Sequence, residues 1–404
     1  MALTNPAVLV SDPVRRNVLL LAVCQAVSNT GSSMLAAVAA LVGYSLADDK
    51  SFATLPLAFQ WTATMATTIP AAQFMRAVGR RAGLSLGAVI FMAGGALGAW
   101  SIWIANFYVF IAACACVGSA MSFVHYYRFA AADSAPEDFK SKAISLVLAG
   151  GVVAAVMGGE VAKLTVDWFE PVLFLGCYVA IVLLGLTVLI ILQGVRIPNL
   201  TAEQRKTSGR PLATIMRQPV FIVAVLSSAL SYAAMIMIMT ATPLAMSACG
   251  FEFHDTATVI QWHVLAMYLP SFFTGSLIQR FGVLRIIAIG GVLICASLTT
   301  SMLGIEFLNF WGGLVLMGLG WNFMFVGGST LLTESYVVEE RAKVQGVNDF
   351  IVFSTTAAAA FGSGVLQGEF GWTAVNGGAV PAMCVALLAV AWMALHRRRI
   401  ADTA

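Results

Sequence analysis

Long apolar runs separated by short polar breaks make up most of this chain of 404 residues. A helix needs about 20 predominantly apolar residues to cross the hydrocarbon core of a bilayer, and the runs reach that length. Lipid offers no water to unpaired backbone groups, so a spanning segment must be a helix or a strand of a closed barrel. The runs are too long and too continuously apolar for barrel strands. The sequence therefore predicts an all-α membrane protein.

The composition agrees with this class. A mean hydropathy of +0.89 and 60% hydrophobic residues exclude an ordinary soluble domain. The seven cysteines lie in or beside the apolar runs without paired spacing, which is typical of small buried residues rather than a disulfide or metal framework. We expect no cofactor, no metal and no nucleic-acid partner.

The basic segment Gly194–Gln218 divides the chain into two halves that resemble each other. Gln60-Trp61 recurs as Gln261-Trp262, and the acidic-then-basic segment that starts at Asp133 recurs at Glu334. We predict two six-helix bundles, residues 1–193 and 219–404, joined by a cytoplasmic linker, residues 194–218. The twelve predicted spans are 17–46, 52–75, 83–104, 107–132, 140–164, 171–193, 219–247, 256–279, 283–304, 307–334, 342–366 and 372–395.

Charge sets the orientation of these spans. With both termini in the cytoplasm, every Lys and Arg except Lys50 and Lys163 falls on the cytoplasmic side. Cytoplasmic loops of membrane proteins are enriched in Lys and Arg, so we predict a multi-pass protein of the cell inner (plasma) membrane with both termini cytoplasmic. Within the linker, residues 201–204 have the pattern of a capping box, and residues 212–216 suit a helix on the membrane surface.

Two predicted loops join helices through a glycine turn flanked by arginines. Their characteristic residues are Arg76, Gly79, Arg80 and Arg81 in the first loop and Gly275, Arg280 and Gly282 in the second. Together with the repeated acidic-then-basic segments, these loops resemble the major facilitator superfamily, whose loop signature is G-x-L-x-D-R-x-G-R-R. The signature Asp is replaced by Arg76 and Gln279. The resemblance implies that these are gating loops, and that a central substrate site opens alternately to each side of the membrane.

Polar side chains recur on one face of the first predicted span. Gln25, Ser28, Asn29 and Ser32 follow helical spacing, and the matching positions of the second half include Ser228 and Tyr232. A polar stripe present in both halves should face the central cavity rather than lipid. The alternative is that these groups hydrogen bond between helices, which we favour for the serines but not for Gln25 and Asn29.

Other polar and aromatic residues complete the predicted substrate site. Trp321-Asn322-Phe323 lies near the middle of a span, where rings and an amide suit a planar polar solute. The alternative is aromatic packing, with Asn322 bonded to a neighbouring helix. The full set of predicted substrate-binding residues is Gln25, Asn29, Gln60, Tyr126, Ser228, Tyr232, Gln261, Trp321 and Asn322.

Few charges fall inside the predicted spans. Asp349 lies within span 342–366, where a carboxylate either carries protons or forms a salt bridge. Arg128 lies at comparable depth in the other half and is the candidate partner; alternatively it reaches back to the lipid phosphates. We therefore assign proton coupling to Asp349 and Arg128. Glu160 and Lys163 are three residues apart and are expected to pair with each other.

These features predict a secondary transporter of a small organic solute, because no nucleotide-binding motif is present to use ATP. Its partners are then the solute, the lipid bilayer and protons as the coupling ion. The family's antiporter motif ends in G-P-x-x-G-G, and residues 154–159 lack its Gly-Pro. This favours uptake of a planar polar nutrient such as a flavin-like vitamin. The alternatives are an efflux antiporter and a transport-inactive sensor; scattered histidines without an H-E-x-x-H motif argue against an enzyme.

Overall fold

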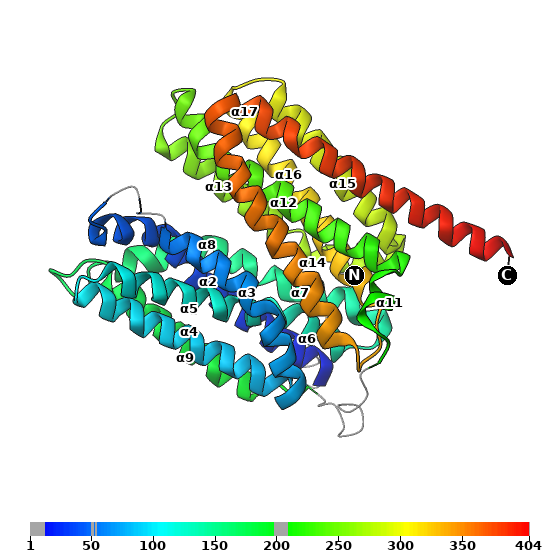
Figure 1. Cartoon of the computed structure of the whole chain (residues 1–404), viewed down its shortest axis with the longest axis horizontal. Coiled ribbons are helices and arrows are strands. Elements are labelled where there is room, and N and C mark those ends of the chain that lie inside the picture. Colours follow the sequence, from blue (N-terminus) through cyan, green and yellow to red (C-terminus); the bar gives the residue numbers. More distant parts are fainter. Residues whose placement is uncertain (1–12, 50–51, 53–54, 198–208, 404) are drawn as a thin grey trace, which may run out of the picture. The chain divides into compact units, whose positions relative to one another are not determined.

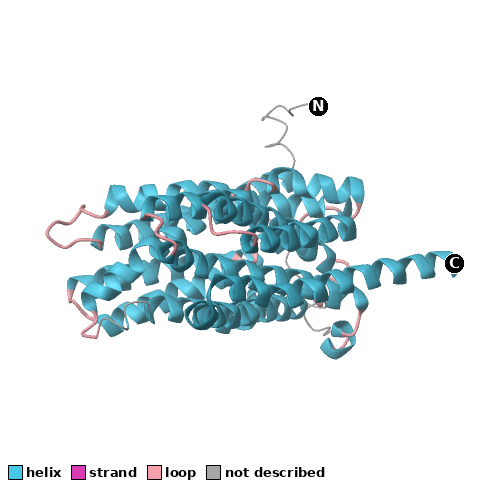
Figure 2. Ribbon diagram, turned by 90° about the horizontal axis from the view of Figure 1, so that it is seen from above, coloured by secondary structure: helices cyan, strands magenta, loops and turns pink. Residues whose placement is uncertain are grey.

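The computed structural model describes residues 13–49, 52, 55–197 and 209–403, and these residues form helices and no β-strand (Figures 1 and 2). The predicted all-α fold is confirmed. The described chain forms two compact units: the first includes the described residues before Gly209 together with Gln345–Phe350, and the second includes Gly209–Val344 and the described residues from Ile351 onward. The predicted capping box at residues 201–204 lies outside the described residues.

The helices of the first unit follow the predicted apolar runs. They are α2 (Pro13–Leu46), α3 (Leu55–Val78), α4 (Arg80–Trp103), α5 (Phe107–Val124), α6 (Tyr127–Asp133), η2 (Glu137–Phe139), α7 (Lys140–Ala149), α8 (Gly151–Thr165) and α9 (Leu175–Gln193). Helix α3 packs against α5, α4 packs against α5 and α9, and α2 packs against α8. Helix α8 approaches α2 closely because Gly158 has no side chain: a Cβ there would lie 2.5 Å from Cβ of Ser33.

The predicted span 107–132 is two helices, because the backbone turns at His125-Tyr126 between α5 and α6. The carbonyl oxygen of His125 accepts a hydrogen bond of 2.9 Å from Nη1 of Arg128. A side chain thus supplies a donor where the helical ladder is interrupted, which backbone groups in an apolar interior require.

Three helices of the second unit pack around α16. Its helices are α11 (Leu212–Met216), α12 (Pro219–Ala248), α13 (Phe253–Tyr268), α14 (Ser271–Phe281), α15 (Val283–Met302), α16 (Phe307–Leu332) and α17 (Arg341–Thr403). Helix α16 packs against α12, α13 and α15. The short helix α11 falls where residues 212–216 were predicted to be helical.

The helix boundaries of the second half differ from the predicted spans at one place and are joined at another. The predicted span 256–279 is divided between α13 and α14 at Leu269-Pro270, because proline lacks the N–H that would continue the helix. The predicted spans 342–366 and 372–395 lie in α17, which is interrupted at Gly371, where φ is 77° and ψ is −175°. In Figure 1 the orange and red parts of α17 are two rods that meet near its label.

Among the described residues, nine helical segments are long and apolar enough to cross a membrane. Helix α17 is counted once in this number although Gly371 divides it. Helix α3 is absent from the nine because it carries several Thr and Gln side chains, and α13 and α14 are absent because the break at Pro270 leaves each short. The predicted number of twelve spans stays a prediction.

The two predicted glycine turns have the same backbone conformation. Gly79 links α3 to α4 with φ 97° and ψ 157°, and Gly282 links α14 to α15 with φ 87° and ψ 147°. No side-chain contact enforces this at Gly282, where a Cβ would have open space. Glycine is required for its backbone angles, because residues with a Cβ rarely adopt such positive φ values.

Candidate functional site

The first unit contains a buried ion pair between the two charges predicted to carry protons. Nη2 of Arg128 on α6 lies 2.5 Å from Oδ1 of Asp349, which belongs to the part of α17 included in this unit. Both side chains are buried, so Arg128 does not reach back to lipid phosphates. Of the two alternatives for Arg128, the ion pair with Asp349 is the one found.

A second buried ion pair lies in the same unit. Nη2 of Arg80 is 2.6 Å from Oδ2 of Asp133, and the same group donates a hydrogen bond to Oε1 of Gln345. Arg80 was predicted to belong to a gating loop, and the structure places it as the first residue of α4, only 3% exposed. Its guanidinium carbon lies 5.7 Å from the ring centre of Tyr126, whose hydroxyl donates to the carbonyl of Thr68.

The carboxylate of Asp349 has a further neighbour in Asn348. Nδ2 of Asn348 donates a hydrogen bond of 2.8 Å to Oδ1 of Asp349. In the described part of the chain, Oδ2 of Asp349 and Oδ1 of Asn348 have no hydrogen-bond partner. Two buried acceptor oxygens without a donor are unusual in a folded protein.

The polar stripe of α2 meets one of the predicted glutamines. Nε2 of Gln60 on α3 lies 3.4 Å from Oγ of Ser32, and Oε1 of Gln60 finds no partner among the described residues. Gln25 is buried at 4% exposure, and Asn29 is partly exposed. Gln60 thus contacts the polar stripe and links α3 to α2 within the first unit.

In the second unit, predicted aromatic residues form a cluster. The rings of Trp321 and Phe325 stack with centres 4.9 Å apart, and Tyr232 lies edge-on to each at 5.4 Å. Tyr268 on α13 lies edge-on to Trp321 at 5.8 Å. Trp321 is buried, and its Nε1 donor has no partner among the described residues. Phe325 was not among the predicted residues, although its helical spacing from Trp321 places both on one face of α16.

The amide of Asn322 is fully engaged inside this unit. Its Nδ2 donates to the carbonyl of Met267 at 2.7 Å and to Oγ of Ser271 at 2.6 Å, and its Oδ1 accepts from Oγ1 of Thr274 at 2.7 Å. These are the bonds to neighbouring helices that the packing alternative requires. The role of Asn322 in substrate binding stays a prediction.

The remaining predicted residues are spread over the two units. Ser228 on α12 is buried, and its hydroxyl has no partner in the part of the chain that the structure describes. Gln261 on α13 is exposed. Arg81 and Arg280, beside the two glycine turns, are also exposed. Gly275 is buried in α14, whereas Arg76 is partly exposed. Lys163 pairs with Glu160 at 2.8 Å, which confirms the expected local ion pair.

Apolar helices long enough to span a bilayer, with buried ion pairs between them, are the features of a multi-pass membrane protein with a functional interior. The family model of the Major Facilitator Superfamily matches residues 21–260 and 224–403. These matches include nearly the whole chain, and the chain belongs to this superfamily of transporters.

Individual relatives extend the comparison. The chain is 40% identical to the riboflavin transporter RfnT of Brucella anthropi, over 93% of this chain and 94% of that protein. Among solved structures, the fucose:proton symporter FucP of Escherichia coli is similar with a TM-score of 0.74 at 15% identity, covering 93% of this chain and 98% of that one. The human organic anion transporter MFSD10 has a TM-score of 0.75 at 13% identity, covering 94% and 100%. Because the sequence identities are so low, these two structures support the fold of this chain and not its substrate.

Proposed function

We propose that this chain carries riboflavin, or a closely related flavin, across the inner membrane into the cell. The observation that carries the proposal is the 40% identity, over 93% of the chain, to a protein named as a riboflavin transporter. Uptake, rather than efflux, agrees with the lack of the family's antiporter Gly-Pro in residues 154–159.

The aromatic cluster of the second unit supports a flavin as the solute. A flavin has a flat tricyclic ring with apolar faces and polar edges, and flat aromatic side chains bind such rings by stacking. Trp321, Phe325, Tyr232 and Tyr268 form a group of such rings, and Nε1 of Trp321, which has no partner among the described residues, is a donor for a polar ring edge. A largely apolar site with a few directed polar groups is typical of small-molecule binding.

Proton coupling through Asp349 forms part of the proposal. Arg80 and Arg128 are balanced by Asp133 and Asp349 in the first unit, so the buried charges cancel in pairs. A proton on Asp349 would leave Arg128 without its counter-charge in a buried position, which is a strongly unfavourable arrangement. Protonation would therefore change the relative stability of the conformations between which the transporter alternates.

Uptake of labelled riboflavin by cells that cannot make the vitamin tests this function. We expect cells expressing the protein to accumulate label, unlabelled riboflavin to compete, and ribitol, which has the polyol but no rings, not to compete. Equal uptake with and without the protein would contradict the proposal. Faster loss of label from preloaded cells would assign export, and the absence of flux in either direction would favour a sensor.

We also propose the predicted topology, with both termini and the segment Gly194–Gln218 in the cytoplasm. The basis is the charge asymmetry, since only Lys50 and Lys163 fall on the outer side. Single cysteines placed at Ser208 and at Asp167, in a background without reactive native cysteines, report the two sides. With a membrane-impermeant thiol reagent on intact cells, Asp167→Cys should label and Ser208→Cys should not. The reverse pattern would show that the orientation is wrong.

A further inference from the structure

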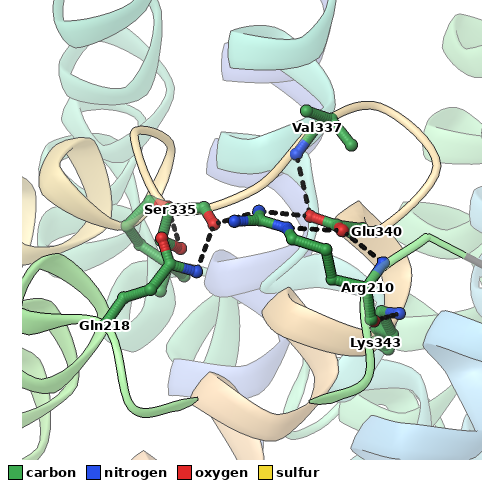
Figure 3. A network of polar contacts seen from close by, with 7 residues as sticks. Arg210, Gln218, Ser335, Val337, Glu340 and Lys343 are labelled. Atoms are coloured by element: carbon green, nitrogen blue, oxygen red, sulfur yellow. Dashed lines mark hydrogen bonds and ion pairs between the residues drawn. The ribbon is translucent and has the colours of Figure 1, made fainter. Parts of the chain in front are cut away.

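A buried carboxylate lies in the loop between α16 and α17. Glu340 is 1% exposed and immediately precedes Arg341, the first residue of α17. Its two oxygens accept four hydrogen bonds: Oε1 accepts from the backbone N–H and Nε of Arg210 at 2.7 and 2.9 Å, and Oε2 accepts from Nη2 of Arg210 at 2.6 Å and from the N–H of Val337 at 3.2 Å (Figure 3). A carboxylate bound in this way holds its donors in one geometry.

The donors come mainly from the end of the predicted linker. Beyond the contacts with Glu340, Nη2 of Arg210 and Nε2 of Gln218 both donate to the carbonyl of Ser335, at 3.0 and 3.1 Å. Nζ of Lys343, in the first turn of α17, donates to the carbonyl of Arg210. Figure 3 shows these groups converging from the linker, the loop and α17. Residues 209–218 are therefore fastened to the α16–α17 loop at both of their ends.

Gly209 makes this close contact possible. Its φ is +59°, and a Cβ built on it would lie 2.4 Å from Cγ of Glu340. A residue with a side chain would meet both an unfavourable backbone angle and the buried Glu340 side chain. The backbone of the linker thus packs directly against the Glu340 side chain at Gly209.

The other end of the linker is fastened within the first unit. Nδ2 of Asn17 donates to the carbonyl of Arg196 at 2.7 Å, and the N–H of Arg196 donates to Oδ1 of Asn17 at 3.0 Å. The predicted linker of residues 194–218 therefore has its first residues bound to one unit and its last ten bound to the other.

Glu340 also lies directly before the helix that carries the buried charges. Gln345 and Asp349 lie about one and two turns beyond Glu340 along α17, at 3.6 residues per turn. Gln345 accepts a hydrogen bond from Arg80, and Asp349 pairs with Arg128. Because Gln345 and Asp349 continue the same helix, we expect a change at the beginning of α17 to affect them.

We infer that Glu340 is a positioning residue for transport: by binding Arg210 it fastens the linker to the α16–α17 loop and fixes the start of α17. In this role it does not contact solute or coupling ion. The variants Glu340→Gln and Gly209→Ala both loosen the contact, the first by removing the charge and the second by steric conflict. Glu339→Gln makes the same chemical change one residue earlier, at a side chain that is only partly buried, and is the matched control.

Hydrogen exchange of the full-length protein in lipid nanodiscs measures the fastening without any substrate. With Glu340→Gln we expect amides in residues 209–218 and in residues 341–350 to exchange at least about tenfold faster, because hydrogen bonds to a charged acceptor are lost. Gly209→Ala should change the same segments, and Glu339→Gln should change neither. Unchanged exchange in residues 341–350 with Glu340→Gln, or an equal change with Glu339→Gln, would overturn the inference. If Glu340→Gln cannot be purified, the result with Gly209→Ala decides.

Transport kinetics supply the second measurement, which rests on the proposed function. Glu340→Gln should lower the maximal rate of riboflavin uptake several-fold per molecule of protein in the membrane, with the half-saturation concentration unchanged. A normal maximal rate would overturn the positioning role. Absence of riboflavin uptake by the unmodified protein would instead contradict the proposed function, and hydrogen exchange would still decide the inference.

The charge state of Glu340 separates its effect from that of Asp349. Hydrogen bonds from Arg210 lower the pKa of Glu340 from 4.5 to about 2. A carboxyl with a depressed pKa stabilises the fold above its unfolded value and loses that contribution only as the pH falls toward the folded value. Glu340 therefore stays ionised throughout the physiological range. The reduction in rate with Glu340→Gln should be the same at pH 5.5 and pH 7.5.

Discussion

Asp349→Asn is expected to abolish accumulation of solute against its gradient while leaving exchange of solute across the membrane intact. Asparagine keeps an acceptor oxygen near Arg128 but cannot bind or release a proton, so it imitates the protonated state permanently. If Asp349 carries the coupling proton, the variant can still alternate with solute bound, but a proton gradient no longer drives it. The prediction is based on the buried ion pair of 2.5 Å and on Oδ2 of Asp349, which has no hydrogen-bond partner among the described residues.

Counterflow and proton-driven uptake measured on the same vesicles distinguish the possible outcomes. Counterflow at a normal rate without accumulation supports a coupling role. Loss of both activities together with poor expression would make Asp349 a structural partner of Arg128. Normal accumulation with its usual pH dependence would remove Asp349 from the mechanism.

Arg128→Met should be the most destabilising single substitution among the charged residues of the first unit. It leaves the carboxylate of Asp349 buried without its counter-charge, and breaking a buried pair in this way costs about 3–5 kcal/mol. Adding Asp349→Asn to Arg128→Met removes the uncompensated charge, so most of the lost stability should return. The thermal unfolding midpoint of purified protein in detergent measures all three variants.

An exposed ion pair provides the matched comparison. Lys163 and Glu160 pair at 2.8 Å with side chains 74% and 54% exposed, and exposed pairs contribute at most about 1 kcal/mol. Lys163→Met should therefore change the midpoint little. A comparable loss with Lys163→Met and Arg128→Met, or a double variant no more stable than Arg128→Met, would show that the buried pair does not act as described.

Much of the fold could be predicted because lipid imposes simple rules on sequence. Apolar runs of spanning length must be helical, and this placed the helices of both halves to within a few residues. The positions at which helices are interrupted were harder to predict. Pro270 divides α13 from α14, whereas Pro70 and Pro243 lie inside α3 and α12 without ending them. Whether a proline ends a helix depends on which neighbours satisfy the freed backbone groups, and a single sequence does not contain that information.

The partners of the buried charges in the site were likewise not predictable from the sequence alone. The sequence showed that Asp349 and Arg128 each needed a reason to lie inside a span, because an unpaired charge there is costly. It left open whether they pair, since they are far apart along the chain and Arg128 had the membrane surface as an alternative. Arg80 was assigned to a gating loop from the loop signature alone, and its partner Asp133, which belongs to a different motif, could not be identified from that signature. Partners of a polar side chain depend on tertiary packing, which local patterns do not specify.

The matching turns at Gly79 and Gly282 show what a repeated unit keeps when its sequence changes. The loops around them share few side chains, and the first has Arg80 after its glycine where the second has Val283. Their backbone angles nevertheless agree within about ten degrees. Side chains can be exchanged wherever a new partner is available, but a left-handed backbone angle accepts almost nothing except glycine. The two halves can therefore diverge in chemistry, toward charge pairs in one and aromatic rings in the other, while these hairpins keep a common shape.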